Sequence, residues 1–150
     1  MVETTTDYRR TFRVKCSVAD AFAFFCDIPA VAGHFEGLAG VSPVSGGWLW
    51  ALPKISVGPV SAEMSWALGY TFDEPASRIM WKPIAGGNSQ CTGQWQLRAV
   101  GEGTEVQFSN RLVAPVDAPK IMRRAVQPVV DKQNKQMQDQ WLANIERHLS

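Results

Sequence analysis

Four residues in this sequence combine a side chain that can take part in chemistry with a position in or beside an apolar stretch. His34 is one of only two histidines, and histidine is the side chain that most readily exchanges a proton near neutral pH. Tyr70 and Asn110 lie between apolar neighbours on predicted strands, and Arg10 shares the inward side of the first strand. If the protein is an enzyme, these four residues are its candidate acid, base or oxyanion-binding groups.

Each of these residues also has a simpler structural explanation. Arg10 would reach solvent from the mouth of its strand, because unpaired arginine is seldom buried. Tyr70, Asn110 and also Gln133 would bond to one another or to the backbone, or else would orient a ligand carbonyl or hydroxyl. His34 would need a partner that holds its ring before it could act as a base. No pair of His, Asp or Glu falls on inward strand positions, so a catalytic pair is not indicated.

Composition and motifs argue against several other classes of function. The net charge of +1 gives no indication of nucleic acid binding. The cysteines, Cys16, Cys26 and Cys91, are odd in number and form no CxxC, so we expect a reducing, cytoplasmic location and no zinc site. There is no P-loop, GxGxxG after a strand, HExxH or GxSxG, and we expect no metal or cofactor. We also expect no signal peptide and no integral membrane segment, because no apolar run is long enough.

Most of the six tryptophans lie on predicted strands. Large aromatic side chains commonly fill a core, but they also line cavities that bind flat or conjugated apolar molecules. The sequence leaves these two alternatives open, and assigns Trp141 to packing. If there is a cavity, the predicted ligand-binding residues are Phe35, Trp48, Trp50, Met64, Trp66, Tyr70, Trp81, Trp95, Phe108, Asn110, Met122 and Val126.

Helical spacing dominates the last third of the chain and predicts a long helix from Pro119 to Leu149. Apolar residues recur there at steps of three and four, as on a helix with one buried face. Asp117 is suited to cap its start, and Pro128 should kink or split it. At about 1.5 Å per residue the helix would be about 46 Å long, so it must lie along a broad partner.

That partner is predicted to be a β-sheet. A first strand from Tyr8 to Lys15 is followed by about six segments of alternating apolar and polar residues, separated by turns. The longest alternation, from Val60 to Phe72, predicts one continuous strand. Two short helices, from Ser17 to Cys26 and from Ile28 to Phe35, come directly after the first strand. Because one face of each strand is apolar and the other polar, the sheet should be antiparallel and covered on one side.

Several short motifs accompany this order of elements. They are Ser17-Val18-Ala19-Asp20-Ala21-Phe22, Asp27-Ile28-Pro29, Gly103-Thr104-Glu105-Val106 and the C-terminal helix. Together they resemble the helix-grip fold of the START-like superfamily, also called the SRPBCC or polyketide cyclase/dehydrase and lipid-transport group. Val57-Gly58-Pro59-Val60 is similar to a stretch in those members that are related to carbon-monoxide dehydrogenase. The resemblance implies a single α+β domain over residues 1–150, in which a seven-stranded curved antiparallel sheet wraps around the long C-terminal helix.

The resemblance also implies a deep cavity between the sheet and the long helix, with residues 28–35 as a lid over its mouth. We therefore expect the protein to bind a small apolar molecule, aromatic or similar to a polyketide or isoprenoid, as a carrier or binding protein. The alternative is a polyketide cyclase, aromatase or dehydratase that uses the same cavity. The scarcity of inward titratable groups favours binding. An accessory role with a protein partner is a further alternative.

Overall fold

The computed structural model describes residues 1–150, and its helices and strands follow the predicted order. The elements are β1 (Val2–Val14), α1 (Val18–Cys26), α2 (Ile28–Ala32), β2 (Gly40–Val44), β3 (Gly47–Ala51), β4 (Ile55–Val57), β5 (Val60–Ala62), β6 (Ser65–Asp73), β7 (Arg78–Gly87), β8 (Gln90–Val100), β9 (Gly103–Val116), the 3-10 turn η1 (Lys120–Met122) and α3 (Arg123–His148).

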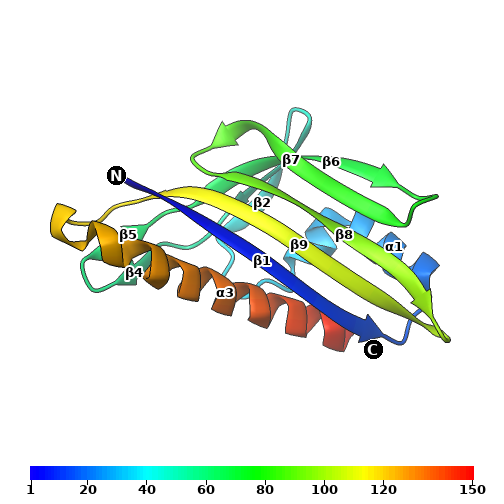
Figure 1. Cartoon of the computed structure of the whole chain (residues 1–150). Helices are drawn as coiled ribbons and strands as arrows, with labels where there is room; N and C mark the ends of the chain where they lie inside the picture. Colours follow the sequence, from blue (N-terminus) through cyan, green and yellow to red (C-terminus); the bar gives the residue numbers. More distant parts are fainter.

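Seven of these strands form one antiparallel sheet in the order β1-β9-β8-β7-β6-β3-β2. The long helix α3 runs along this sheet, and the short β4 and β5 lie beside its N-terminal half (Figure 1). The helices α1 and α2 lie near its C-terminal half, where side chains of α3 bond to the backbone of the 28–35 segment. The predicted helix-grip architecture is therefore confirmed.

The two short helices begin at residues whose side chains cap them. Ser17 Oγ accepts a hydrogen bond of 3.1 Å from the backbone N–H of Asp20, and the Asp27 carboxylate accepts one of 3.2 Å from Ala30. These bonds satisfy N–H groups that have no partner inside a helix. Because Asp27 both ends α1 and caps α2, the second helix follows at once and turns its apolar residues into the core.

The prediction of one continuous strand from Val60 to Phe72 is wrong. β5 pairs with β4 in a separate two-stranded sheet, and β6 begins only at Ser65. Asn88 bonds to both sides of the interruption: its Oδ1 accepts from Ser65 N–H at 2.9 Å, and its Nδ2 donates to the Glu63 carbonyl at 2.6 Å. The alternation of side chains keeps its phase across the interruption, so spacing could not reveal it.

The C-terminal helix is one helix rather than two. α3 continues through Pro128 without a break, so the predicted split is wrong. Pro128 lies in the second turn, where it removes a single hydrogen bond close to the helix start. Asp117 does not cap the helix either, because its backbone N–H and carbonyl pair with Ser61. The helical segment starts instead with η1, directly after Pro119.

Candidate functional site

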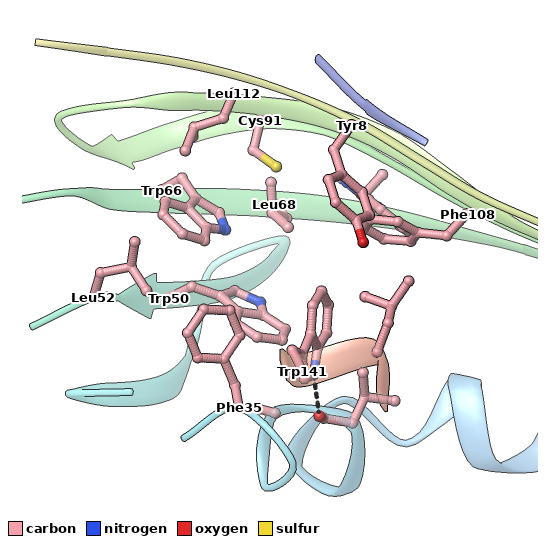
Figure 2. Close-up of a cluster of buried hydrophobic side chains, with 14 of the residues drawn as sticks. Tyr8, Phe35, Trp50, Leu52, Trp66, Leu68, Cys91, Phe108, Leu112 and Trp141 are labelled. Carbon is pink, nitrogen blue, oxygen red and sulfur yellow. Dashed lines mark hydrogen bonds between the residues drawn. The ribbon is translucent and has the colours of Figure 1, made fainter. Parts of the chain in front are cut away.

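An apolar cavity lies between the sheet, residues 25–35 and α3. Of its 18 lining residues 15 are hydrophobic, and none is Asp, Glu, His, Lys or Arg. The cavity offers about 50 Å³ to the centres of water-sized molecules, which is room for a few waters at about 10–15 Å³ each. Figure 2 shows aromatic and aliphatic side chains from the sheet and the helices converging on this interior. The cavity is therefore narrow, because large side chains occupy most of the space around it.

Trp141 of α3 lies among the aromatic side chains that surround the cavity (Figure 2). Its ring centroid is 5.4 Å from that of Phe35, 5.9 Å from that of Trp50 and 5.6 Å from that of Trp95. Its Nε1 donates a hydrogen bond of 3.0 Å to the backbone carbonyl of Val31, which is drawn as a dashed line in Figure 2. This bond joins the long helix to the lid segment and holds residues 28–35 against the cavity.

Asn110 of β9 is the centre of a polar cluster in the cavity wall. Its Oδ1 accepts hydrogen bonds from Trp81 Nε1 at 3.0 Å and from Cys91 Sγ at 2.9 Å. Its Nδ2 donates to Gln138 Oε1 at 3.3 Å. The Asn110 amide is thus satisfied by the protein, which is the structural alternative offered by the sequence for inward polar groups.

Tyr70 of β6 presents a hydroxyl that is only partly engaged. Its oxygen accepts a hydrogen bond of 3.0 Å from Trp50 Nε1. Burial raises the pKa of Tyr70 well above its usual value, so the hydroxyl keeps its proton at neutral pH and can donate it in a hydrogen bond. Burial also raises the pKa of Cys91 to about 12, although hydrogen bonds to Asn110 and Trp81 oppose this shift. Neither residue is therefore a base at neutral pH.

The long helix contributes two buried amides to the cavity wall that the sequence analysis missed. Asn134 and Gln138 are only 2% and 7% exposed, and both line the cavity. The predicted stripe passed through Gln133 and Met137, one residue before each of them. The spacing that would have found them is the step of four that joins the buried positions Val126, Val130, Asn134, Gln138 and Leu142. It was missed because amide side chains were assumed to face solvent.

The four catalytic candidates are not brought together in one place. Tyr70 and Asn110 line the cavity, whereas His34 and Arg10 do not. Arg10 donates to the backbone carbonyl of Asp139 at 3.1 Å in an exposed position at the sheet edge, which agrees with its predicted position at the strand mouth. The cavity itself therefore offers a phenol and an amide, but no group that would act as a proton acceptor at neutral pH.

His34 lies in a shallow surface recess beside the end of α3. Its ring centroid is 4.6 Å from that of His148 and 5.6 Å from that of Phe24. Burial lowers the pKa of His34, and the neighbouring His148 lowers it further. The Asn144 amide donates to the His34 carbonyl at 3.0 Å, so this contact fixes the end of the lid segment to α3. The arrangement gives His34 a structural environment outside the cavity.

Most of the predicted ligand-binding residues line the cavity. These are Phe35, Trp50, Trp66, Tyr70, Trp81, Trp95 and Asn110. Phe108 and Val126 are buried in the core, Trp48 and Met122 are half-buried outside the cavity, and Met64 lines a smaller space between β4, β5 and α3. The cavity residues outside the predicted set are Phe25, Ile28, Val31, Leu52, Leu68, Cys91, Leu112, Asn134, Met137, Gln138 and Trp141.

The fold recurs in solved structures of low sequence identity. TTHA0849 from Thermus thermophilus is 14% identical with a TM-score of 0.62, and the match covers 97% of this chain and 99% of that one. Major latex-like protein 151 from Panax ginseng is 13% identical with a TM-score of 0.61, covering 97% of both chains. The Zhui aromatase/cyclase from Streptomyces sp. R1128 is 13% identical with a TM-score of 0.51, covering 95% and 86%.

No protein-family model and no curated protein matches the sequence. The chain nevertheless has the helix-grip fold of the START-like superfamily, as the resemblance of its sequence implied. None of its helices has the length and apolar character needed to cross a membrane.

Proposed function

We propose that the protein binds a small, neutral, apolar molecule in the cavity between the sheet, residues 25–35 and α3. The observation that carries this proposal is the composition of the cavity wall, which is hydrophobic at 15 of 18 residues and contains no charged side chain. Such a wall would leave a charged ligand unpaired at a high cost, whereas it favours apolar surface. A ligand that buries about 200 Å² of apolar surface would gain about 5 kcal/mol, at about 25 cal/mol per Å², before the costs of association.

Binding requires the cavity to enlarge. Pockets for drug-sized molecules usually have volumes of about 300–1,000 Å³, far above the 50 Å³ of this cavity. The residues best suited to move are Met137, which is half-buried and flexible, and the lid residues Val31 and Phe35. We infer that the ligand takes space made by rearranging these side chains, and that the Trp141–Val31 hydrogen bond opposes this change.

The structural neighbours support this proposal only in general terms. One is named a major latex-like protein and another an aromatase/cyclase, so the same fold occurs under both kinds of name. A cyclase, aromatase or dehydratase acting on a polyketide-like substrate is the second candidate function. The protonated Tyr70 hydroxyl favours it, because a phenol can donate to a substrate carbonyl and stabilise charge that develops there. For this candidate, Tyr70→Phe should abolish turnover and leave binding intact.

Fluorescence of the neutral probe N-phenyl-1-naphthylamine tests the binding function. The probe should show enhanced emission and energy transfer from the cavity tryptophans in the wild-type protein. Met137→Trp places a larger side chain in the cavity wall and should weaken binding at least tenfold. Gln136→Trp, at the adjacent exposed position, is the matched control and should bind as the wild type does. Absence of probe binding to the folded wild type, or equal binding by the Met137→Trp variant, would contradict the proposal.

A further inference from the structure

A band of polar side chains crosses the otherwise apolar interior. Asn134 and Gln138 lie one helical turn apart on the buried face of α3, so their amides are neighbours. Apolar residues occupy the positions on either side of them along the helix, Val130 and Leu142. Buried amides are costly unless every polar atom has a partner, so the partners of this pair decide whether it is purely structural.

All but one of the side-chain polar groups in this band are engaged. Asn110 Nδ2 donates to Gln138 Oε1 at 3.3 Å, and Gln138 Nε2 donates to the Asn134 backbone carbonyl at 3.4 Å. Asn134 Nδ2 in turn donates to Thr6 Oγ1 of β1 at 3.1 Å. The exception is Asn134 Oδ1, which is buried and has no hydrogen-bond partner. An acceptor in this state carries the full cost of its lost hydration, which a purely structural residue would not be expected to keep.

The position of the unpartnered oxygen connects it to the cavity. Asn134 is only 2% exposed to solvent, and it is one of the cavity-lining residues. The other bonds of its side chain and backbone fix the amide from β1 and from Gln138. A molecule in the cavity can therefore satisfy Asn134 Oδ1 only by offering a hydrogen-bond donor.

Building on the proposed binding function, we propose that the ligand is a neutral apolar alcohol or phenol whose hydroxyl donates a hydrogen bond to Asn134 Oδ1. An ammonium group could also donate, but no carboxylate lines the cavity to balance its charge. A ketone, ether or hydrocarbon of the same shape lacks the donor and would leave the oxygen unsatisfied. Such polar discrimination is characteristically stronger than discrimination by one methylene group.

Isothermal titration calorimetry with 2-naphthol and 2-methoxynaphthalene tests this inference. The two probes share the ring system, but only 2-naphthol has a donor. The wild-type protein should bind 2-naphthol at least about tenfold more tightly, the size of effect expected when a buried acceptor is left unpaired. Asn134→Leu should bring the ratio of the two affinities close to one while changing the affinity for 2-methoxynaphthalene by less than about threefold. Gln133→Leu, outside the cavity, is the matched control and should keep the ratio.

The outcomes separate this inference from the binding function on which it rests. If N-phenyl-1-naphthylamine fails to bind, the binding function itself is wrong. If that probe binds, but the wild type does not bind 2-naphthol or does not distinguish it from 2-methoxynaphthalene, only the hydroxyl inference is overturned. A ratio that persists in Asn134→Leu overturns it too. Should that variant fold poorly, Thr6→Val/Asn134→Leu replaces both partners of the buried bond and provides the same comparison.

Discussion

Trp81 on β7 donates a hydrogen bond of 3.0 Å to Asn110 on β9, although β8 lies between these two strands. The bond is possible because the residue of β8 that is paired with both is Gly93, which has no side chain. The pairing of β7 with β8 also ends at this point, since the rest of β7 pairs only with β6. Trp81 and Asn110 line both the internal cavity and a groove on the outer face of the sheet. Their hydrogen bond thus ties the sheet together where the two spaces come closest.

Gly93→Ala should destabilise the protein by about 1–3 kcal/mol, the usual cost of forcing a methyl group into a packed interior. An added Cβ would lie 2.8 Å from both Asn110 Oδ1 and Trp81 Cζ2, and would also collide with the backbone oxygen of Ser109, which cannot move aside. Urea unfolding followed by tryptophan fluorescence measures the change. Gly40→Ala is the control, because the Cβ added there would have no atom within 4 Å. Equal stabilities of the two variants would contradict the packing described for Gly93.

Trp141→Phe should loosen the lid segment. The substitution keeps an aromatic ring but removes the Nε1 donor, so the Val31 carbonyl loses its bond to α3. We expect a loss of about 1–3 kcal/mol in the free energy of unfolding, as for other unsatisfied buried groups. Hydrogen exchange of residues 28–35, measured by mass spectrometry, should become faster relative to the sheet. Trp48→Phe, at a half-buried site outside the cavity, is the control, and unchanged lid exchange in Trp141→Phe would refute this role.

His34 should titrate below its ordinary pKa of 6.5, because burial and His148 both disfavour its charged form. Since the unfolded chain then binds the proton more readily, stability should fall as the pH drops below 6.5 and stop falling below the folded-state pKa. Glu36 and Arg147 border the same recess and face this pair with opposite charges.

NMR titration of the His34 imidazole in the wild type and in His148→Gln measures this shift. The pKa of His34 should rise toward 6.5 in the variant, because one of the two causes is removed. The pH dependence of urea unfolding should become correspondingly weaker. A wild-type pKa at or above 6.5 would show that the two rings do not influence each other in this way.

The sheet and the general course of the chain could be predicted because they follow from local patterns. Alternation of apolar and polar residues indicates the strands, and the capping residues Ser17 and Asp27 fix the starts of the short helices. The interruption before Ser65 could not be predicted in the same way. It depends on hydrogen bonds from Asn88, which is distant in the sequence and comes close only after β6 and β7 have paired.

The aromatic part of the candidate site was predictable, and its polar part was not. Trp50, Trp66, Trp81 and Trp95 fall on inward strand positions, so their phase alone predicts that they meet inside the sheet. Asn134 differs because an amide on a helix usually faces solvent. Its burial becomes intelligible only when Thr6 of β1 is seen to accept its N–H, a contact between residues at opposite ends of the chain.

Cys91 offers a chemical readout of cavity opening. It is 2% exposed, and its pKa of about 12 leaves almost no reactive thiolate at about pH 8. Iodoacetamide should therefore modify the half-exposed Cys16 and Cys26 first, and Cys91 only through opening of the cavity. Peptide mapping over time gives the three rates.

Trp141→Phe should accelerate the labelling of Cys91, because the lid opens more often when its bond to α3 is removed. Saturating N-phenyl-1-naphthylamine should slow it, because the probe would occupy the space beside the thiol. The rates at Cys16 and Cys26 serve as internal controls, since neither residue lines the cavity. If Cys91 in the native protein reacts as fast as Cys16, the thiol is not enclosed, and the cavity does not depend on the lid for access.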